Sequence, residues 1–173
     1  MQSRGVKMKI IFDNKEELIL QAKKDGACSD GIGWAERRDL KTILIECPIG
    51  FRMWALKHGY VQFAKYFDFS ELDGCDIVCI LIDQPQFAKK CDFSELNGDN
   101  ISFLLRYQPE FAQYCDFNKL SGWNIAKLLS HQPQFMNNCD LSKLDKRDIN
   151  YLLGHQPQLA KYFGIEDKHI QKM

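Results

Sequence analysis

The chain has 173 residues, of which 45% are hydrophobic and 27% charged, with 23 basic and 23 acidic side chains. The apolar fraction excludes a disordered chain, and only 11 Gly and 5 Pro residues exclude a collagen-like or linker-like one. Zero net charge gives no general attraction to phosphate, which disfavours a strongly basic nucleic-acid binder. We therefore expect a soluble globular unit whose core needs neither disulfides nor metals.

The start of the chain indicates the compartment. The first ten residues, MQSRGVKMKI, lack the apolar core of a secretory signal peptide, and the seven cysteines are an odd number. Both observations favour a cytoplasmic protein with reduced thiols. No apolar run approaches the length of about 18 residues that spans a bilayer, so we expect no contact with the membrane interior.

Residues 1–59 precede the regular part of the chain, and we interpret them as an N-terminal helical cap. Asp13 or Asn14 is placed to cap a helix over residues 15–24, which Gly26 would end. Residues 40–48 resemble residues 101–109 further along the chain. The cap is therefore expected to contain a degenerate copy of a repeat.

A repeat of 24 residues organises residues 60–163. Copies begin with a Gln-Pro pair at Gln84, Gln108, Gln132 and Gln156, and a copy without the proline begins at Tyr60. Other columns keep the same register: Phe63, Phe87, Phe111, Phe135 and Leu159; Leu72, Leu96, Leu120 and Leu144; Ile77, Ile101, Ile125 and Ile149. Residues 164–173 are interpreted as a polar C-terminal tail.

Each copy is predicted to contain two short helices joined by turns. Proline presets φ for a first helical turn, so Pro109 is expected to begin a helix of about two turns. Asp116 would then cap a 3₁₀ turn that ends at Gly122. Asn124 would cap the second helix, whose Ile-x-x-Leu-Leu spacing gives it one apolar face.

A single copy is too small to fold alone. Its few apolar side chains do not offset the entropy of ordering 24 residues, so neighbouring copies must bury one another's faces. The predicted fold is an all-α, short helical-repeat solenoid that alternates α and 3₁₀ helices behind the N-terminal helical cap.

The repeat pattern Gln-Pro-x-Phe-Ala-x-x-Cys-Asp-Phe-x-x-Leu-x-Gly resembles tandem repeats in uncharacterised bacterial and phage proteins. In that family aromatic residues often occupy the places of Trp123 and Phe69, and the segment from Gly26 to Gly59 resembles the leader that precedes such repeats. No activity comes with the family. Its setting implies a small inhibitor or immunity-type protein in bacterial or phage conflict.

A more distant similarity is to leucine-rich repeat variant proteins, on the repeat length and the proline placement. This resemblance implies a superhelix of alternating α and 3₁₀ helices. Members of that family can carry an N-terminal iron–sulfur cluster held by four cysteines, but only Cys28 and Cys47 precede the repeats here. The cluster is not carried over, and we expect no cofactor.

Nothing in the sequence predicts catalysis or a metal centre. Cys91, Cys115 and Cys139 share a column in which Phe67 and Phe163 replace them, so we interpret that column as packing, not as ligands. No C-x-x-C pair and no phosphate-binding or nucleophile-elbow motif is present. The protein is therefore not expected to be an enzyme.

Columns that vary between copies are the candidate binding positions. Large aromatic or charged side chains occupy positions on the second helix that the repeat does not fix. The predicted partner-binding residues are Asp99, Phe103, Arg106, Trp123, Lys127, Arg147 and Tyr151. The alternative is that these side chains are solvated or pack between copies, with Trp123 filling a gap.

The leading functional hypothesis is a non-enzymatic scaffold that binds another protein. The alternative is a nucleic-acid-binding helical repeat protein. Residues 60–131 hold 6 basic and 10 acidic side chains, which disfavours phosphate binding along the repeats, whereas the basic region before them keeps weak nucleic-acid contact open.

Overall fold

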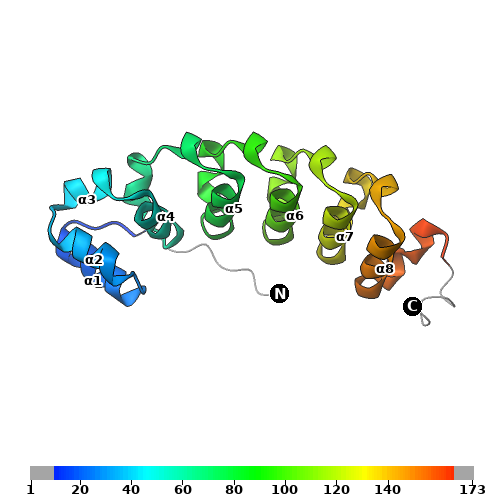
Figure 1. The fold of residues 1–173 in the computed structure, drawn as a ribbon, viewed down its shortest axis with the longest axis horizontal. Coiled ribbons are helices and arrows are strands. Elements are labelled where there is room, and N and C mark those ends of the chain that lie inside the picture. Colours follow the sequence, from blue (N-terminus) through cyan, green and yellow to red (C-terminus); the bar gives the residue numbers. More distant parts are fainter. Residues whose placement is uncertain (1–9, 166–173) are drawn as a thin grey trace. The chain divides into compact units, whose positions relative to one another are not determined.

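The computed structural model describes residues 10–165, and within this range the chain is all-α. The chain passes from one short helix to the next (Figure 1). Eight α-helices and nine 3₁₀ helices follow one another in this range, and its sole β feature is an isolated bridge between Ile10 and Tyr60. The prediction of an all-α helical-repeat fold is confirmed. Parts of the predicted cap and tail, residues 1–9 and 166–173, lie outside the described residues.

The chain divides into two compact units. Of the described residues, the first unit comprises 10–72 and 79–92, and the second 73–78 and 93–165. The first contains α1 (Lys15–Lys24), α2 (Ser29–Glu36), α3 (Leu40–Glu46), α4 (Ile49–Lys57), η1 (Val61–Lys65), η2 (Phe69–Glu71) and η3 (Pro85–Lys90). The second contains η4 (Phe93–Glu95), α6 (Gly98–Tyr107), η5 (Pro109–Tyr114), η6 (Phe117–Lys119), α7 (Gly122–His131), η7 (Pro133–Asn138), η8 (Leu141–Lys143), α8 (Lys146–His155) and η9 (Pro157–Phe163). Helix α5 (Gly74–Asp83) belongs partly to each unit.

The first helix forms where its capping signal predicts. The Asn14 side chain accepts a hydrogen bond from the backbone N–H of Glu17 (2.9 Å), and the helix covers Lys15–Lys24. Its apolar stripe is buried in the first unit. Gly26 follows with a φ of +81°, a left-handed conformation that costs glycine little, and the chain there leaves the helix.

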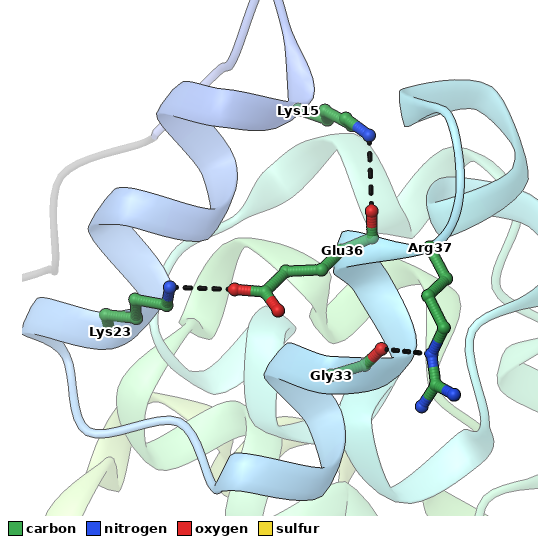
Figure 2. A network of polar contacts seen from close by, with 5 residues as sticks. All are labelled: Lys15, Lys23, Gly33, Glu36 and Arg37. Carbon is green, nitrogen blue, oxygen red and sulfur yellow. Dashed lines mark hydrogen bonds and ion pairs between the residues drawn. The ribbon is translucent and has the colours of Figure 1, made fainter.

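Polar contacts on the surface hold α1 against α2 (Figure 2). The Lys23 ammonium lies 2.8 Å from a carboxylate oxygen of Glu36, and Lys15 donates to the Glu36 backbone carbonyl (3.3 Å). The hydrogen bond and the charge of Lys23 lower the pKa of the Glu36 carboxyl. Arg37 donates to the carbonyl of Gly33 (2.8 Å), which gives a partner to a carbonyl near the end of α2.

In the repeats, the helix predicted after each proline is a 3₁₀ helix. Within η5, the N–H of Phe111 donates to Gln108, and the N–H of Cys115 after it donates to Ala112, both at 3.2 Å and both three residues back. Phe111 is buried, as its column requires. The predicted cap of the next 3₁₀ turn also forms, because the Asp116 side chain accepts from the N–H of Asn118 (3.0 Å).

The predicted caps of the second helices are wrong by one turn. In α7 the N-cap is Ser121, whose hydroxyl accepts from the N–H of Asn124 (3.2 Å), while the Asn124 side chain accepts from the N–H of Ser121 (3.1 Å). Asn124 is therefore the third helical residue of a reciprocal capping box. The same correction applies to Asn100 and Asp148, whose N-caps are Asn97 and Asp145, and to Asp76, whose N–H donates to Asp73.

Glycine begins α5, α6 and α7 because the next copy approaches the helix start closely. A Cβ on Gly74 would lie 2.5 Å from the Asn100 side-chain oxygen and 2.7 Å from the Glu95 carbonyl oxygen. The corresponding contacts, also under 3.0 Å, are those of Gly98 with Lys119 and Asn124, and of Gly122 with Lys143 and Asp148. The prediction that these glycines end the 3₁₀ turn is therefore wrong.

Polar side chains also link successive copies of the second unit. Lys119 Nζ donates to the carbonyls of Ser94 (2.6 Å) and Leu96 (2.9 Å), and Lys143 repeats this pattern one copy later with Asn118 and Leu120. On the Gln-Pro turns, Gln132 donates to the carbonyl of Arg106 (2.9 Å), and Gln156 to that of Ser130 (2.8 Å). These bonds satisfy carbonyls of the preceding copy and so favour one register of stacking.

Candidate functional site

The predicted partner-binding residues lie on α6, α7 and α8, which pack in chain order (Figure 1). The apolar faces of these helices are buried, including Leu104 and Leu128. The residues that recur in every copy therefore form the core between the helices. Two aromatic residues of the varied columns remain open to solvent: Trp123 is 44% exposed and Phe103 is 47% exposed. We call the exposed residues of the predicted set, with the rings that touch them, the aromatic surface; its residues are Asp99, Phe103, Tyr107, Trp123, Arg147 and Tyr151.

Trp123, Lys127 and Tyr151 come together. The rings of Trp123 and Tyr151 lie 4.7 Å apart between centroids, and the Lys127 ammonium lies 5.2 Å from the Trp123 ring, a cation–π contact. His155 extends the group, because its ring lies 4.4 Å from that of Tyr151. Trp123 therefore has an exposed part and a part that packs on the next copy. It combines features of the two interpretations offered by the sequence, a partner-binding residue and a residue that fills a gap between copies.

Phe103 and Arg106 form a second group on α6. The ring of Phe103 lies 5.0 Å from that of Tyr107, and the Arg106 guanidinium carbon lies 5.5 Å from the Tyr107 ring. The i, i+4 spacing of Phe103 and Tyr107 could have identified this pair from the sequence, as could that of Tyr151 and His155.

Asp99 and Arg147 have other local roles. Asp99 is exposed but accepts a hydrogen bond from the Asn124 side chain (2.7 Å), so its carboxylate ties α6 to α7. Arg147 is exposed next to the cap of α8, where the N–H of Asp148 first, and then Arg147, lower the pKa of Asp145. The seven predicted residues thus divide into three parts: the group of Trp123, Lys127 and Tyr151, the pair of Phe103 and Arg106, and the two helix-start residues Asp99 and Arg147.

The two histidines of the repeats, His131 and His155, each contact a backbone carbonyl one turn back in their own helix. The Nδ1 atom of His131 lies 3.2 Å from the carbonyl oxygen of Lys127, and that of His155 lies 2.9 Å from the carbonyl oxygen of Tyr151. Both contacts are made at the end of a helix.

The first unit holds a cavity that sequence reasoning missed. Its volume is about 360 Å³, and it lies among α1, α2, α3, α4 and the start of η1. Aromatic side chains form much of its wall: Trp34, Phe51, Trp54, Tyr60 and Phe63. None of the residues that line it is charged. Tyr60 and Phe63 belong to the first copy of the repeat, whereas Trp34, Phe51 and Trp54 lie in residues 1–59, and the interpretation of that segment as a structural cap assigned these three rings no role.

Small residues keep this cavity open, and its rings are held in place. Gly26, Gly31 and Gly50 line it, and a Cβ on Gly31 would lie 3.2 Å from the Phe51 ring. The Tyr60 hydroxyl donates to Asp25 (2.8 Å), and burial, followed by this bond, raises the pKa of the phenol. The wall is therefore built of fixed apolar groups.

Two cysteines line the cavity and differ in exposure. Cys28 is exposed at the start of α2, where its sulfur accepts from the N–H of Gly31 (3.4 Å). Cys47 is buried, and burial raises the pKa of its thiol to about 11. Among the described residues, no group of three or more His, Cys, Asp or Glu side chains could hold a metal ion.

Two further findings bear on function. No helix in the described part of the chain is both long and apolar enough to cross a membrane. Comparison with protein-family models, with curated proteins and with solved structures found no match for the chain. The resemblances to bacterial and phage repeats and to leucine-rich repeat variants therefore stay predictions.

Proposed function

We propose that this protein is a non-enzymatic scaffold that binds another protein through the aromatic surface of α6, α7 and α8. One observation carries the proposal: the indole of Trp123 is 44% exposed beside Tyr151 and Lys127, at a position that other copies fill with Cys75, Asp99 or Arg147. The repeat does not require an indole there. Rigid, exposed aromatic side chains are common anchors of protein interfaces.

The charges around the rings favour one kind of partner. Lys127 lies against Trp123 and Arg106 against Tyr107, while Arg147 is exposed at the start of α8. Asp99, which accepts a hydrogen bond from Asn124, is the one acidic member of the predicted set, against the three cations. We infer a partner segment that carries apolar side chains beside acidic ones, because these would meet the rings and the cations together.

The narrower role of a small inhibitor or immunity-type protein rests on the resemblance to bacterial and phage repeats. In that role, occupation of a partner's surface would be the whole activity, and no catalytic group would be needed. Nucleic acid is the less favoured partner, because residues 60–131 hold 6 basic and 10 acidic side chains and this excess of negative charge repels a phosphate backbone.

Affinity capture from the source cell tests the proposal with matched variants. The wild-type chain and Trp123→Ala are compared with Tyr162→Ala, which removes an exposed ring outside the aromatic surface. We expect one partner whose recovery falls at least about tenfold for Trp123→Ala, as for an interface anchor, and is unchanged for Tyr162→Ala. Equal recovery by all three would contradict the assignment. Salt-sensitive shifts of DNA or RNA at low salt would favour the nucleic-acid alternative.

A further inference from the structure

We infer that the cavity of the first unit is a binding site for a small, uncharged molecule with an aromatic or alicyclic ring system. This inference is independent of the aromatic surface, because every residue that lines the cavity belongs to the first unit. The argument rests on the size of the cavity, the chemistry of its wall and the rigidity of its rings.

The size suits a ligand of two or three rings. The volume of about 360 Å³ falls in the range of small-molecule pockets, about 300–1,000 Å³. A buried apolar cavity of about 150 Å³ already takes up benzene. A molecule with a fused ring pair and one further ring would fill the space without displacing the helices.

The wall selects against charge. The lining residues include no Asp, Glu, Lys, Arg or His, and the single phenol, Tyr60, already donates its hydrogen bond to Asp25. An anionic ligand would lose its hydration there and meet the negative faces of the rings, whereas an uncharged ring system would gain apolar burial and ring contacts. The site is therefore expected to discriminate by charge more strongly than by shape.

The rings that would contact the ligand are positioned before it arrives. Arg38 donates to the Trp34 carbonyl (2.7 Å) and lies 4.0 Å from the Trp34 ring centroid. Trp54 stacks on His58 with centroids 4.2 Å apart, and it meets Tyr60 edge-on at 5.6 Å. Because these side chains are already ordered, binding costs little conformational entropy.

Fluorescence titration tests the inference with N-phenyl-1-naphthylamine, an uncharged probe of the proposed class. The chain has three tryptophans, so Trp123→Phe leaves Trp34 and Trp54 as reporters, both of which line the cavity. We expect saturable quenching of tryptophan emission with one probe bound per chain and a dissociation constant in the micromolar range. Absence of saturable quenching would overturn the inference.

Two glycines supply a matched pair of variants. A Cβ on Gly50 or on Gly154 would meet nothing within 4 Å, but only Gly50 lines the cavity. In the Trp123→Phe background, Gly50→Leu is expected to weaken probe binding at least tenfold, and Gly154→Leu to leave it unchanged. Ala27 also lines the cavity, and it lies between α1 and α2, outside any helix. Ala27→Leu is therefore the second blocking variant, and its effect on probe binding tests the inference if Gly50→Leu does not fold.

The charge of the probe provides the last arm. 8-Anilino-1-naphthalenesulfonate has the rings of N-phenyl-1-naphthylamine and carries a sulfonate in addition. We expect it to bind the cavity at least tenfold more weakly than the uncharged probe does. Unchanged probe binding in both folded blocking variants, or equal affinity for the two probes, would contradict a neutral-ligand site in this cavity.

Discussion

Gly98 shows how a single residue fixes the distance between copies. A side chain there would meet the Lys119 carbonyl and the Asn124 side chain at under 3.0 Å, and the first of these is backbone that cannot move aside. Gly98→Ala is therefore expected to destabilise the protein by about 1–3 kcal/mol, the usual cost of overpacking. Urea unfolding followed by circular dichroism measures this change.

Gly154 is the control for that substitution, since it lies inside α8 with nothing within 4 Å of its missing Cβ. Alanine has the higher helix propensity, so Gly154→Ala should stabilise the protein by up to about 1 kcal/mol. The two substitutions are identical in chemistry and opposite in predicted sign. A stabilising effect of Gly98→Ala would show that the copies do not approach as closely as described.

At the scale of the element, the capping boxes explain why the sequence placed each second helix correctly and its cap wrongly. Ser121 and Asn124 both have side chains that cap helices, and spacing alone does not tell which is the N-cap. The structure decides it, because Gly122 must be helical to let the next copy approach. Capping chemistry could be read from the sequence, but the contact between copies could not.

The cap of α8 predicts a pH dependence. Hydrogen bonds from the N–H groups of Asp148 and Arg147 lower the pKa of Asp145 below its ordinary value of 3.8. Its stabilising contribution is therefore present at neutral pH and is lost as the pH falls below 3.8 through the folded-state value. Asp145→Asn keeps a cap that does not titrate, so the variant should lose less stability between about pH 5 and about pH 2.

Thermal unfolding at several pH values across this window checks the prediction. The wild-type melting temperature should fall more steeply with acid than that of Asp145→Asn. Parallel curves for the two proteins would mean that the carboxylate of Asp145 is not preferentially stabilised in the folded state.

At the scale of the whole molecule, the repeat was predictable and the cavity was not. The columns of Phe111 and Leu128 recur every 24 residues, so periodicity alone predicted that they are buried. Trp34, Phe51 and Trp54 lie outside the repeat. They come together because of the way in which α1 to α4, four helices without a shared sequence pattern, pack against one another. Sequence patterns carry information about repeated contacts, and single contacts between distant segments leave no such pattern.

The seven thiols should divide into two classes. Cys28, Cys75 and Cys79 are exposed, whereas Cys47 is buried and Cys91, Cys115 and Cys139 are partly so. Burial raises the pKa of each of these last four to about 11, and the thiolate is the reactive form. Ellman's reagent near pH 8 should therefore modify three thiols rapidly and four slowly. Equal rates for all seven would contradict the burial of the cysteine column.

Position-specific photo-cross-linking tests the role of the aromatic surface most directly. A benzophenone amino acid replaces Phe103 on α6 in one variant and Tyr114 on η5 in the other, both exposed aromatic positions of the second unit. Irradiation in the source cell should give a discrete protein adduct from position 103, lost when Trp123→Ala is added, and none from position 114. An adduct of equal yield from position 114, or one from position 103 that survives Trp123→Ala, would contradict the account.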